Sequence, residues 1–300
     1  MARVLLLVTG VMEEKALARS LKGCFPAHEF VCKPRLDGFT SSRLPPDFAA
    51  LSETERKLLN VDKFLKTMIG AFAPGGRRDA PKPDFLLAIE DLELLNTDTP
   101  KNITNTVRDG LLRNLQAWPA DGLILQRLTD ALKERCSFHL MAPMTEAYFF
   151  ADPAAFARAT APGPDHPNLF DPARADAESF LVEDPAYLTP NDLPKKDHRW
   201  RRANRRVHPK HYLEYLTDPR LDNNPRYDEL TLGCEALEQL AWGPMLTSSP
   251  PALRFARSLF TDLAEMLGES PADCTLEDID AGDCHPLTWP PPRDRVLRNL

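Results

Sequence analysis

The stretch from Val4 to Val8, VLLLV, followed by Thr9 and Gly10, decides the fold class of this chain. A continuous apolar run of branched residues that ends in a tight turn is typical of a strand buried on both faces, as in a parallel sheet. A helix is predicted to follow directly, with Glu13 in its first turn, where a carboxylate favours the helix dipole. Its apolar residues recur at helical spacing: Met12, Ala16, Leu17, Leu21 and Phe25.

The same strand pattern returns further along the chain. Apolar runs at Phe85–Ile89 and Phe138–Ala142 predict two more central strands, and Phe30–Pro34 predicts a shorter one. Strands that alternate with helices at this spacing imply right-handed crossovers, so we predict an α/β fold with a mostly parallel sheet flanked by helices. Ligands of such sheets bind at the carboxyl ends of the strands.

Helical patterns occupy the segments between the strands. Ser52 and Glu55 form a capping box, and one helix is predicted from there to the Pro74-Gly75-Gly76 stop. Its apolar face comprises Leu58, Leu65, Met68, Ile69 and Phe72. Further helices are predicted from Val107 to Trp118 and from Leu123 to Lys133.

The second half of the chain differs in composition. Its prolines cluster at 162–194 and 286–292, which indicates long irregular connections. After Ser249-Pro250-Pro251, an apolar stripe predicts a helix that ends at Gly268. We therefore predict an α/β domain at 1–155, a Pro- and Asp-rich insertion or lid at 156–200, a helical C-terminal region at 201–270 and an irregular tail at 271–300.

Composition also narrows the class of protein. With 300 residues and 43% hydrophobic residues, the chain is long enough for a buried core. No signal-peptide pattern and no apolar run of about 20 residues is found, so we expect a cytoplasmic protein without membrane spans. The six cysteines form no C-x-x-C pair and are expected to be reduced thiols. Phosphate-binding and dinucleotide-binding glycine motifs are also absent from the sequence.

Acidic residues follow the predicted strands. Asp91 and Glu93 come after the second central strand, Glu13 after the first and Glu146 after the third. Side chains two residues apart leave the same side of an extended backbone, so Asp91 and Glu93 are predicted to reach one metal ion. Carboxylates are the ligands that Mg²⁺ and Mn²⁺ prefer, and these ions assist reactions at phosphodiesters. Alternatively, such residues are solvated caps, and the helix dipole alone explains Glu13.

A basic stretch lies between Lys195 and Lys210, where eight residues are basic and one is acidic although the chain as a whole has a net charge of −7. Its arginines and lysines would contact phosphates, and Trp200 would stack on a base. The predicted nucleic-acid contacts are Lys195, Lys196, Arg199, Arg201, Arg202, Arg205, Arg206 and Lys210. A solvated charged face that pairs with acidic groups is the alternative.

Three stretches carry a family resemblance: Leu5–Leu17 (LLLVTGVMEEKAL), Phe85–Glu93 (FLLAIEDLE) and Met141–Pro153 (MAPMTEAYFFADP). They resemble the apolar strand with its V-E-G turn, the Asp-x-Asp strand end and the A-x-P-x-x-E-A-W-x-x-A-D-P signature of Toprim-like proteins. This prokaryotic family is commonly encoded beside AAA- or ABC-type ATPases. The segments His208–Leu213 and Arg254–Leu263 are also similar to its C-terminal features.

The chain departs from that family at two positions. Thr9 stands where the family has the catalytic glutamate of the turn, and Glu93 stands where it has the second aspartate. Glu93 is a conservative change for a metal ligand, whereas a threonine cannot act as a carboxylate base. Either Glu13 or Glu90 compensates for the loss, or the site is degenerate.

The resemblance implies a Mg²⁺- or Mn²⁺-dependent nuclease subunit that acts on DNA or RNA with an ATPase partner in defence against phage. Asp91, Glu93 and Glu13 would be its catalytic and metal-binding residues, with Glu146 as a further ligand. The competing hypothesis is a catalytically silent Toprim-like module that binds nucleic acid or regulates an ATPase.

Overall fold

The computed structural model describes residues 1–34, 39–44, 51–74, 82–159, 177–188, 205–218, 224–247, 253–280 and 295–300. At its centre is a four-stranded sheet of strand order β2-β1-β3-β4, in which every neighbouring pair is parallel. The strands are β1 (Arg3–Val8), β2 (Glu29–Cys32), β3 (Phe85–Asp91) and β4 (Cys136–Met141). The predicted α/β class and the predicted strands are thereby confirmed.

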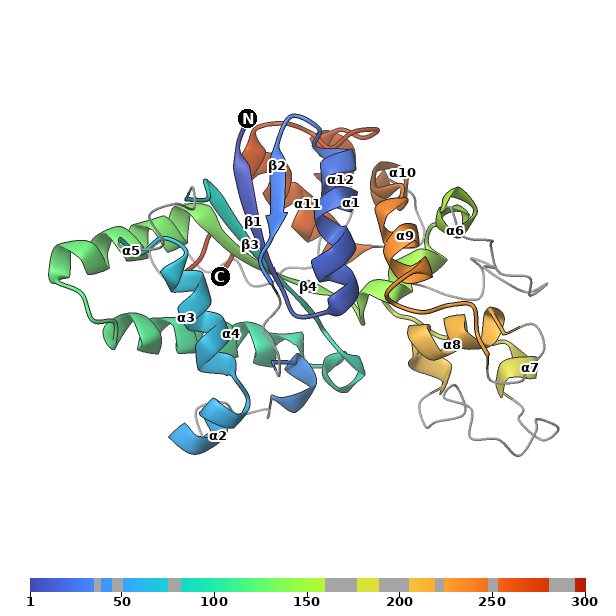
Figure 1. The fold of residues 1–300 in the computed structure, drawn as a ribbon, viewed down its shortest axis with the longest axis horizontal. Coiled ribbons are helices and arrows are strands. Elements are labelled where there is room, and N and C mark those ends of the chain that lie inside the picture. Colours follow the sequence, from blue (N-terminus) through green and yellow to red (C-terminus); the bar gives the residue numbers. More distant parts are fainter. Residues whose placement is uncertain are drawn as a thin grey trace.

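Side chains from alternate strand positions enter two separate cores. Leu6 and Val8 of β1 face a core that includes residues of α1, α9 and α11. Leu86 and Ala88 of β3 face the other core, which includes residues of α3, α4 and α5. Figure 1 shows these two groups of helices on opposite sides of the sheet. Burial on both faces explains why the strands read as continuous apolar runs.

The helices and helical turns surround this sheet. In chain order they are η1 (Glu13–Leu17), α1 (Ala18–Cys24), η2 (Ser41–Arg43), α2 (Glu53–Leu58), α3 (Val61–Gly70), η4 (Leu94–Asn96), α4 (Pro100–Gln116), α5 (Gly122–Arg135), η5 (Thr145–Phe150), α6 (Ala154–Arg158), α7 (Pro185–Leu188), η8 (Arg205–Val207), α8 (Pro209–Leu216), α9 (Leu232–Glu238), α10 (Trp242–Thr247), α11 (Arg254–Leu267) and α12 (Leu276–Asp280). No helix among the described residues is both long and apolar enough to cross a membrane.

The predicted single helix after Ser52 is wrong in one respect, because the structure divides it into α2 and α3. The chain breaks at Asn60, which has a left-handed φ of 53°. Asparagine tolerates this conformation better than most residues. The break turns α2 off the line of α3, and Leu58 is therefore 73% exposed instead of lying on the apolar face. The capping box of Ser52 and Glu55 is present as predicted.

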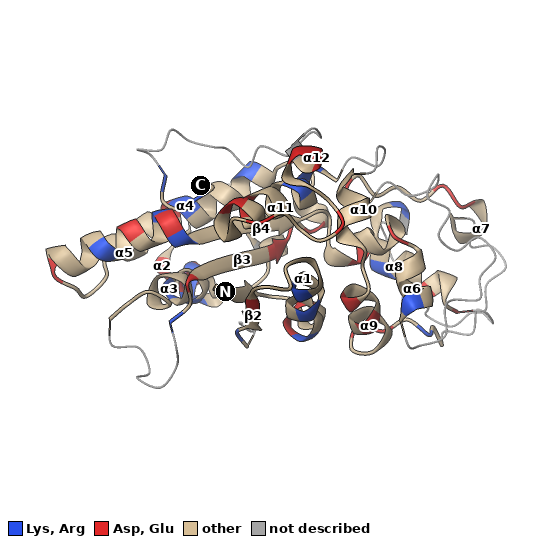
Figure 2. Ribbon diagram, turned by 90° about the horizontal axis from the view of Figure 1, so that it is seen from above, with Lys and Arg blue, Asp and Glu red and all other residues tan. Residues whose placement is uncertain are grey.

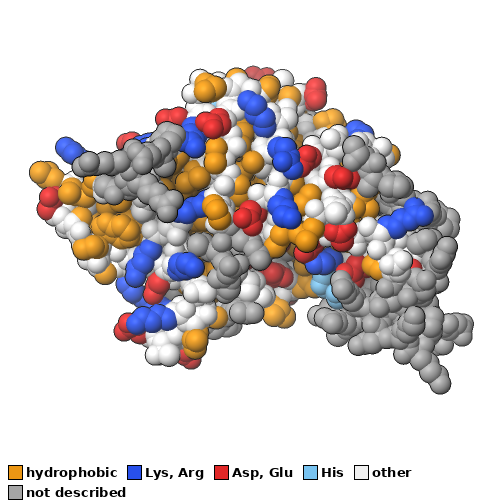
Figure 3. Space-filling view, viewed as in Figure 1, with side chains coloured by type: hydrophobic (Ala, Val, Ile, Leu, Met, Phe, Trp, Pro, Cys, Tyr) orange, Lys and Arg blue, Asp and Glu red, His pale blue; other side chains and the backbone are white. Residues whose placement is uncertain are grey.

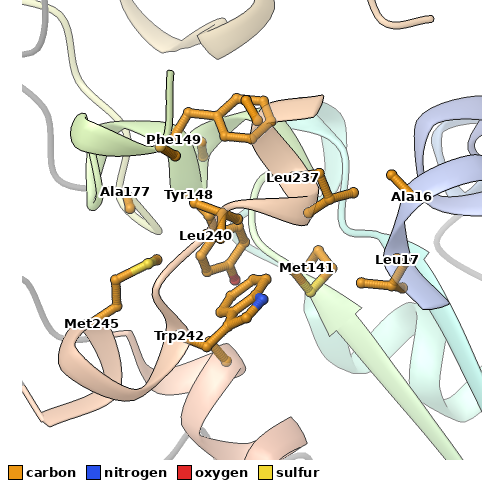
Figure 4. Close-up of a cluster of buried hydrophobic side chains, with 14 of the residues drawn as sticks. Ala16, Leu17, Met141, Tyr148, Phe149, Ala177, Leu237, Leu240, Trp242 and Met245 are labelled. Atoms are coloured by element: carbon orange, nitrogen blue, oxygen red, sulfur yellow. The ribbon is translucent and has the colours of Figure 1, made fainter. Parts of the chain in front are cut away.

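The C-terminal region is helical, as predicted, and it shares the first core with the strands. Tyr148 of η5 packs against Trp242 of α10, with ring centroids 5.6 Å apart (Figure 4). Trp242 also packs against Phe260 of α11, at 5.1 Å. Apolar residues from both sides of the predicted boundary at residue 155 therefore belong to one buried cluster.

Two long-range contacts hold the outer elements in place. Residues 295–300 lie along β4, where Asn299 accepts a hydrogen bond from the Phe138 amide and donates one to the Phe138 carbonyl. At the start of α11, the Glu178 carboxylate accepts hydrogen bonds from the amides of Phe255 and Ala256, and from the Tyr148 hydroxyl at 2.9 Å. A carboxylate in this position satisfies free amides and complements the helix dipole.

Glu178→Ala is expected to lower the free energy of unfolding by about 1–2 kcal/mol, because it removes this cap and leaves the buried Tyr148 hydroxyl without its acceptor. Denaturant unfolding followed by circular dichroism measures the loss. The control is Glu183→Ala, which removes an exposed glutamate five residues away. An equal effect of the two substitutions would contradict the capping role.

Candidate active site

The carboxyl ends of β1 and β3 meet at a single edge of the sheet. From β1 the chain passes to β2 on one side, and later enters β3 on the other, so the strand order reverses between β1 and β3. Ligands of open parallel sheets bind outside the strand ends at such a point. Figure 2 shows the tip of β3 coloured for acidic residues at this edge.

Glu13, in the first turn after β1, is buried and folds back over the turn that precedes it. Its carboxylate lies so close to Gly10 that a β-carbon at Gly10 would overlap it. Burial raises the pKa of Glu13, while a hydrogen bond with the Thr145 side chain opposes that shift. Gly10 is therefore required by the space that the Glu13 carboxylate occupies.

Asp91, the last residue of β3, is the centre of the acidic cluster. Its Oδ1 atom accepts hydrogen bonds from the Thr145 amide, at 3.0 Å, and from the Thr145 hydroxyl, at 3.2 Å. The surrounding protein raises the pKa of Asp91 well above its ordinary value by desolvation, followed by repulsion from Glu13 and Glu146. The structure thus brings together three acidic residues that lie at or after the ends of three different strands.

Glu146 extends the cluster from the turn after β4. It is 5% exposed, and the Tyr227 hydroxyl donates a hydrogen bond to its Oε1 atom at 3.3 Å. Burial, and then repulsion from Glu13, raises the pKa of Glu146 to about 7. A carboxyl group with this pKa exchanges its proton near neutrality.

Glu90 lies beside Thr9, the residue that the family resemblance singles out. The Thr9 hydroxyl donates a hydrogen bond to Glu90 Oε2, and the Ser41 amide donates one to Oε1 at 2.7 Å. Burial raises the pKa of Glu90 to about 8, even though both hydrogen bonds favour the charged form. A carboxyl group is therefore present next to the β1 turn, although Thr9 itself has none.

Glu93 is oriented differently from the prediction. The strand ends at Asp91, and Glu93 has a φ of 64° and a ψ of 150°, so the regular alternation between the two residues does not continue. Glu93 accepts a hydrogen bond from the Thr40 hydroxyl at 3.3 Å. Non-glycine residues rarely adopt this conformation, and strained residues cluster at functional sites. The Glu93 carboxylate still adds to the repulsion at Asp91.

Lys210, one of the predicted nucleic-acid contacts, borders the acidic cluster. It forms an ion pair with Glu229, and its charge lowers the pKa of Glu146. Burial alone would lower the pKa of Lys210, but Glu146 and Glu229 outweigh that effect and raise it. Lys210 thus offsets part of the negative charge of the acidic cluster.

Of the other predicted nucleic-acid contacts, the structure describes Arg206 in full and Arg205 by its backbone alone. Lys195, Lys196, Arg199, Arg201 and Arg202 lie outside the described residues. Arg205 belongs to η8 without a described side chain, and Arg206 is exposed.

The cluster has the donor chemistry for a hard divalent cation, because carboxylate oxygens converge at one edge of the sheet. Among the described residues, however, no group of three or more histidine, cysteine, aspartate or glutamate side chains is already arranged to hold a metal ion. Binding would therefore need rotation of the carboxylate side chains of Glu13, Asp91 and Glu146 toward a common point.

Comparisons of the chain with protein-family models, with curated proteins and with solved structures find no match. The fold and the side chains of the acidic cluster are therefore the features of this chain that bear on its function.

Three residues that bond to the acidic cluster were not predicted from the sequence. Thr145, which donates to Asp91, is adjacent in sequence to the predicted site residue Glu146, and that position could have indicated its role. Ser41 and Tyr227 are distant from any strand end in the sequence, and only folding brings them to Glu90 and Glu146.

Glu90→Gln is expected to stabilise the protein more at pH 8 than at pH 5. Because the pKa of Glu90 rises from about 4.5 to about 8 on folding, the folded state holds this proton more tightly than the unfolded chain. The resulting stability is present below the pKa that Glu90 has in the unfolded chain, and it is lost as the pH rises toward 8. Glutamine cannot ionise, so the variant does not lose this stability as the pH rises.

Urea unfolding of parent and variant at the two pH values measures the difference. The matched control is Glu134→Gln, at an exposed residue of α5. An advantage of Glu90→Gln that did not grow with pH would contradict the expected direction of the pKa shift.

Proposed function

We propose that this chain is a Toprim-like, metal-dependent nuclease subunit that cleaves phosphodiester bonds of nucleic acid. The observation that carries the proposal is the cluster of Glu13, Asp91 and Glu146, whose buried or half-buried carboxyl groups repel one another at the switch point of the sheet. Buried carboxylates that repel one another are costly, and perturbed pKa values concentrate at functional sites. A divalent cation would relieve the repulsion.

Asp91, Glu13 and Glu146 are the residues that would hold Mg²⁺ or Mn²⁺, with Glu93 at the side of the cluster. A bound cation of this kind neutralises charge on a phosphate and lowers the pKa of water. Thr145 orients Asp91 through its amide and hydroxyl. Lys210 supplies a positive charge beside the carboxylates, and attracts the phosphate backbone.

The biological setting of the proposal comes from the family resemblance. We propose a cytoplasmic protein with an AAA- or ABC-type ATPase partner and a role in defence against phage. The sequence contains no phosphate-binding glycine loop of its own, which is consistent with ATP hydrolysis by a partner.

A catalytically silent module is the second candidate, and two observations favour it. Thr9 carries no carboxylate, and the described side chains form no ready-made metal group. In that case, the chain would bind nucleic acid or regulate the ATPase without cleaving anything.

Asp91→Asn is expected to reduce cleavage of labelled DNA or RNA in Mn²⁺ by at least a hundredfold, because it removes the central carboxylate (loss of about 3 kcal/mol of transition-state stabilisation). The assay compares the parent protein with the variant, each with and without the product of a neighbouring ATPase gene. Asp98→Asn, at an exposed position in the same loop, is the control. Cleavage that survives Asp91→Asn would refute the site, and no cleavage by the parent under any condition would favour the silent module.

Gly10→Ala is expected to weaken Mn²⁺ binding at least fivefold with little change in stability, since the three atoms nearest to the added methyl group all belong to the flexible end of the Glu13 side chain. Isothermal titration calorimetry measures the affinity, and thermal unfolding measures the stability. Gly23→Ala is the control, because a β-carbon there meets no atom within 4 Å. That change should leave Mn²⁺ binding intact and stabilise α1 by about 0.5–1 kcal/mol. Equal Mn²⁺ affinities of the two variants would exclude Glu13 from the metal site.

A further inference from the structure

A basic hollow lies over α2, α3 and the end of α4, away from the acidic cluster. It consists of two adjoining cavities of about 380 and 470 Å³, which share Arg56, Asp62 and Lys66. Figure 3 shows lysine and arginine side chains gathered over the region of α2 and α3, at the lower left. Two cavities that share a wall form one continuous depression, which suits an extended ligand better than a compact one.

Cations dominate the lining of this hollow. The basic residues are Arg56, Lys57, Lys63, Lys66 and Arg113, and the acidic ones are Glu53 and Asp62. Both acidic groups have partners, because Glu53 pairs with Lys57 at 2.7 Å and Asp62 accepts a hydrogen bond from Asn114 at 3.1 Å.

Lys63 and Lys66 are the cations most available to a ligand. They are exposed and lie three residues apart on α3, and therefore on one side of the helix. Neither forms an ion pair within the part of the chain that the structure describes. In a chain with a net charge of −7, such a local excess of positive charge needs an explanation.

An aromatic ring completes the hollow. Trp118 follows the end of α4, lines the larger cavity and is half-buried. Its indole packs partly on the second core, so the ring is held in place. A fixed aromatic face beside a row of cations is the combination that binds single-stranded nucleic acid, with phosphates on the cations and a base on the ring.

We propose that this hollow binds single-stranded nucleic acid, with Lys63 and Lys66 on the phosphates and Trp118 against a base. The inference rests on the proposed nuclease function, and it adds a substrate contact away from the acidic cluster where cleavage is proposed. An acidic protein surface would use the same cations but would have no need of the aromatic face.

The position of the hollow predicts a requirement for substrate length. Three residues separate α4 from η4, the helical turn that follows Glu93, and the 17 residues of α4 end two residues before Trp118. At about 1.5 Å per residue, α4 spans about 25 Å. A strand with the rise of one strand of a duplex, about 3.4 Å per nucleotide, would need about seven nucleotides to cover the length of α4.

The test measures binding without catalysis. Fluorescence anisotropy with labelled oligothymidylate in excess EDTA compares the parent protein with the double variant Lys63→Glu/Lys66→Glu. The double variant is expected to raise the Kd at least tenfold, and to reduce the slope of log Kd against log salt by about two. Trp118→Leu is expected to raise the Kd roughly tenfold through the loss of stacking.

The control is Lys82→Glu/Lys133→Glu, an equal charge change near the amino ends of β3 and β4, which should leave the Kd close to that of the parent. Circular dichroism establishes that each variant is folded. An unchanged Kd for folded Lys63→Glu/Lys66→Glu would overturn the proposal. So would competition by polyglutamate as strong as that by unlabelled oligothymidylate, since that result would assign the hollow to an acidic protein.

The two proposals can fail separately. Binding that depends on Lys63 and Lys66, in a protein that cleaves nothing in Mn²⁺, would support the hollow and refute the nuclease. Cleavage that depends on Asp91, together with binding that does not depend on Lys63 and Lys66, would support the nuclease and refute the hollow as a binding site.

Discussion

Parallel pairing between β1 and β3 is the constraint on which the rest of this structure depends. The register that places Val8 opposite Ile89 brings the residues after both strands to one edge of the sheet. Thr9 therefore meets Glu90, and Glu13 approaches Asp91. A shift of one residue in this register would turn the alternate apolar side chains away from their cores, so packing holds the acidic edge in place.

Burying carboxyl groups together opposes folding, and the protein offsets that cost with partners from distant segments. Thr145 donates to Asp91, Tyr227 to Glu146, and Ser41 to Glu90. These hydrogen bonds give the carboxylates partners, but burial, and then mutual repulsion, still raises the pKa values of all three groups. A site that remains electrostatically unfavourable within a well-packed fold is suited to attract a cation.

The second half of the chain contributes side chains to the acidic cluster that the first half forms. Lys210 of α8 and Tyr227 both reach the cluster formed after the strands, while Glu178 joins η5 to the start of α11. These contacts tie the helical region to the acidic edge, since Tyr148 belongs to the same turn as Thr145 and Glu146. The apolar cluster around Tyr148 and Trp242 makes this connection stiff, because close-packed interiors have low compressibility and transmit strain.

Local patterns in the sequence determined the strands, their parallel arrangement and the acidic edge, because apolar runs and strand-end residues depend on near neighbours along the chain. The Asn60 break, the turn of Glu93 and the partners Ser41, Tyr227 and Glu178 depend on contacts between residues far apart in sequence. The hollow at Lys66 and Trp118 likewise exists only where α3 packs against α4. Tertiary structure decided these features, because a side chain's partners and orientation follow from packing in three dimensions.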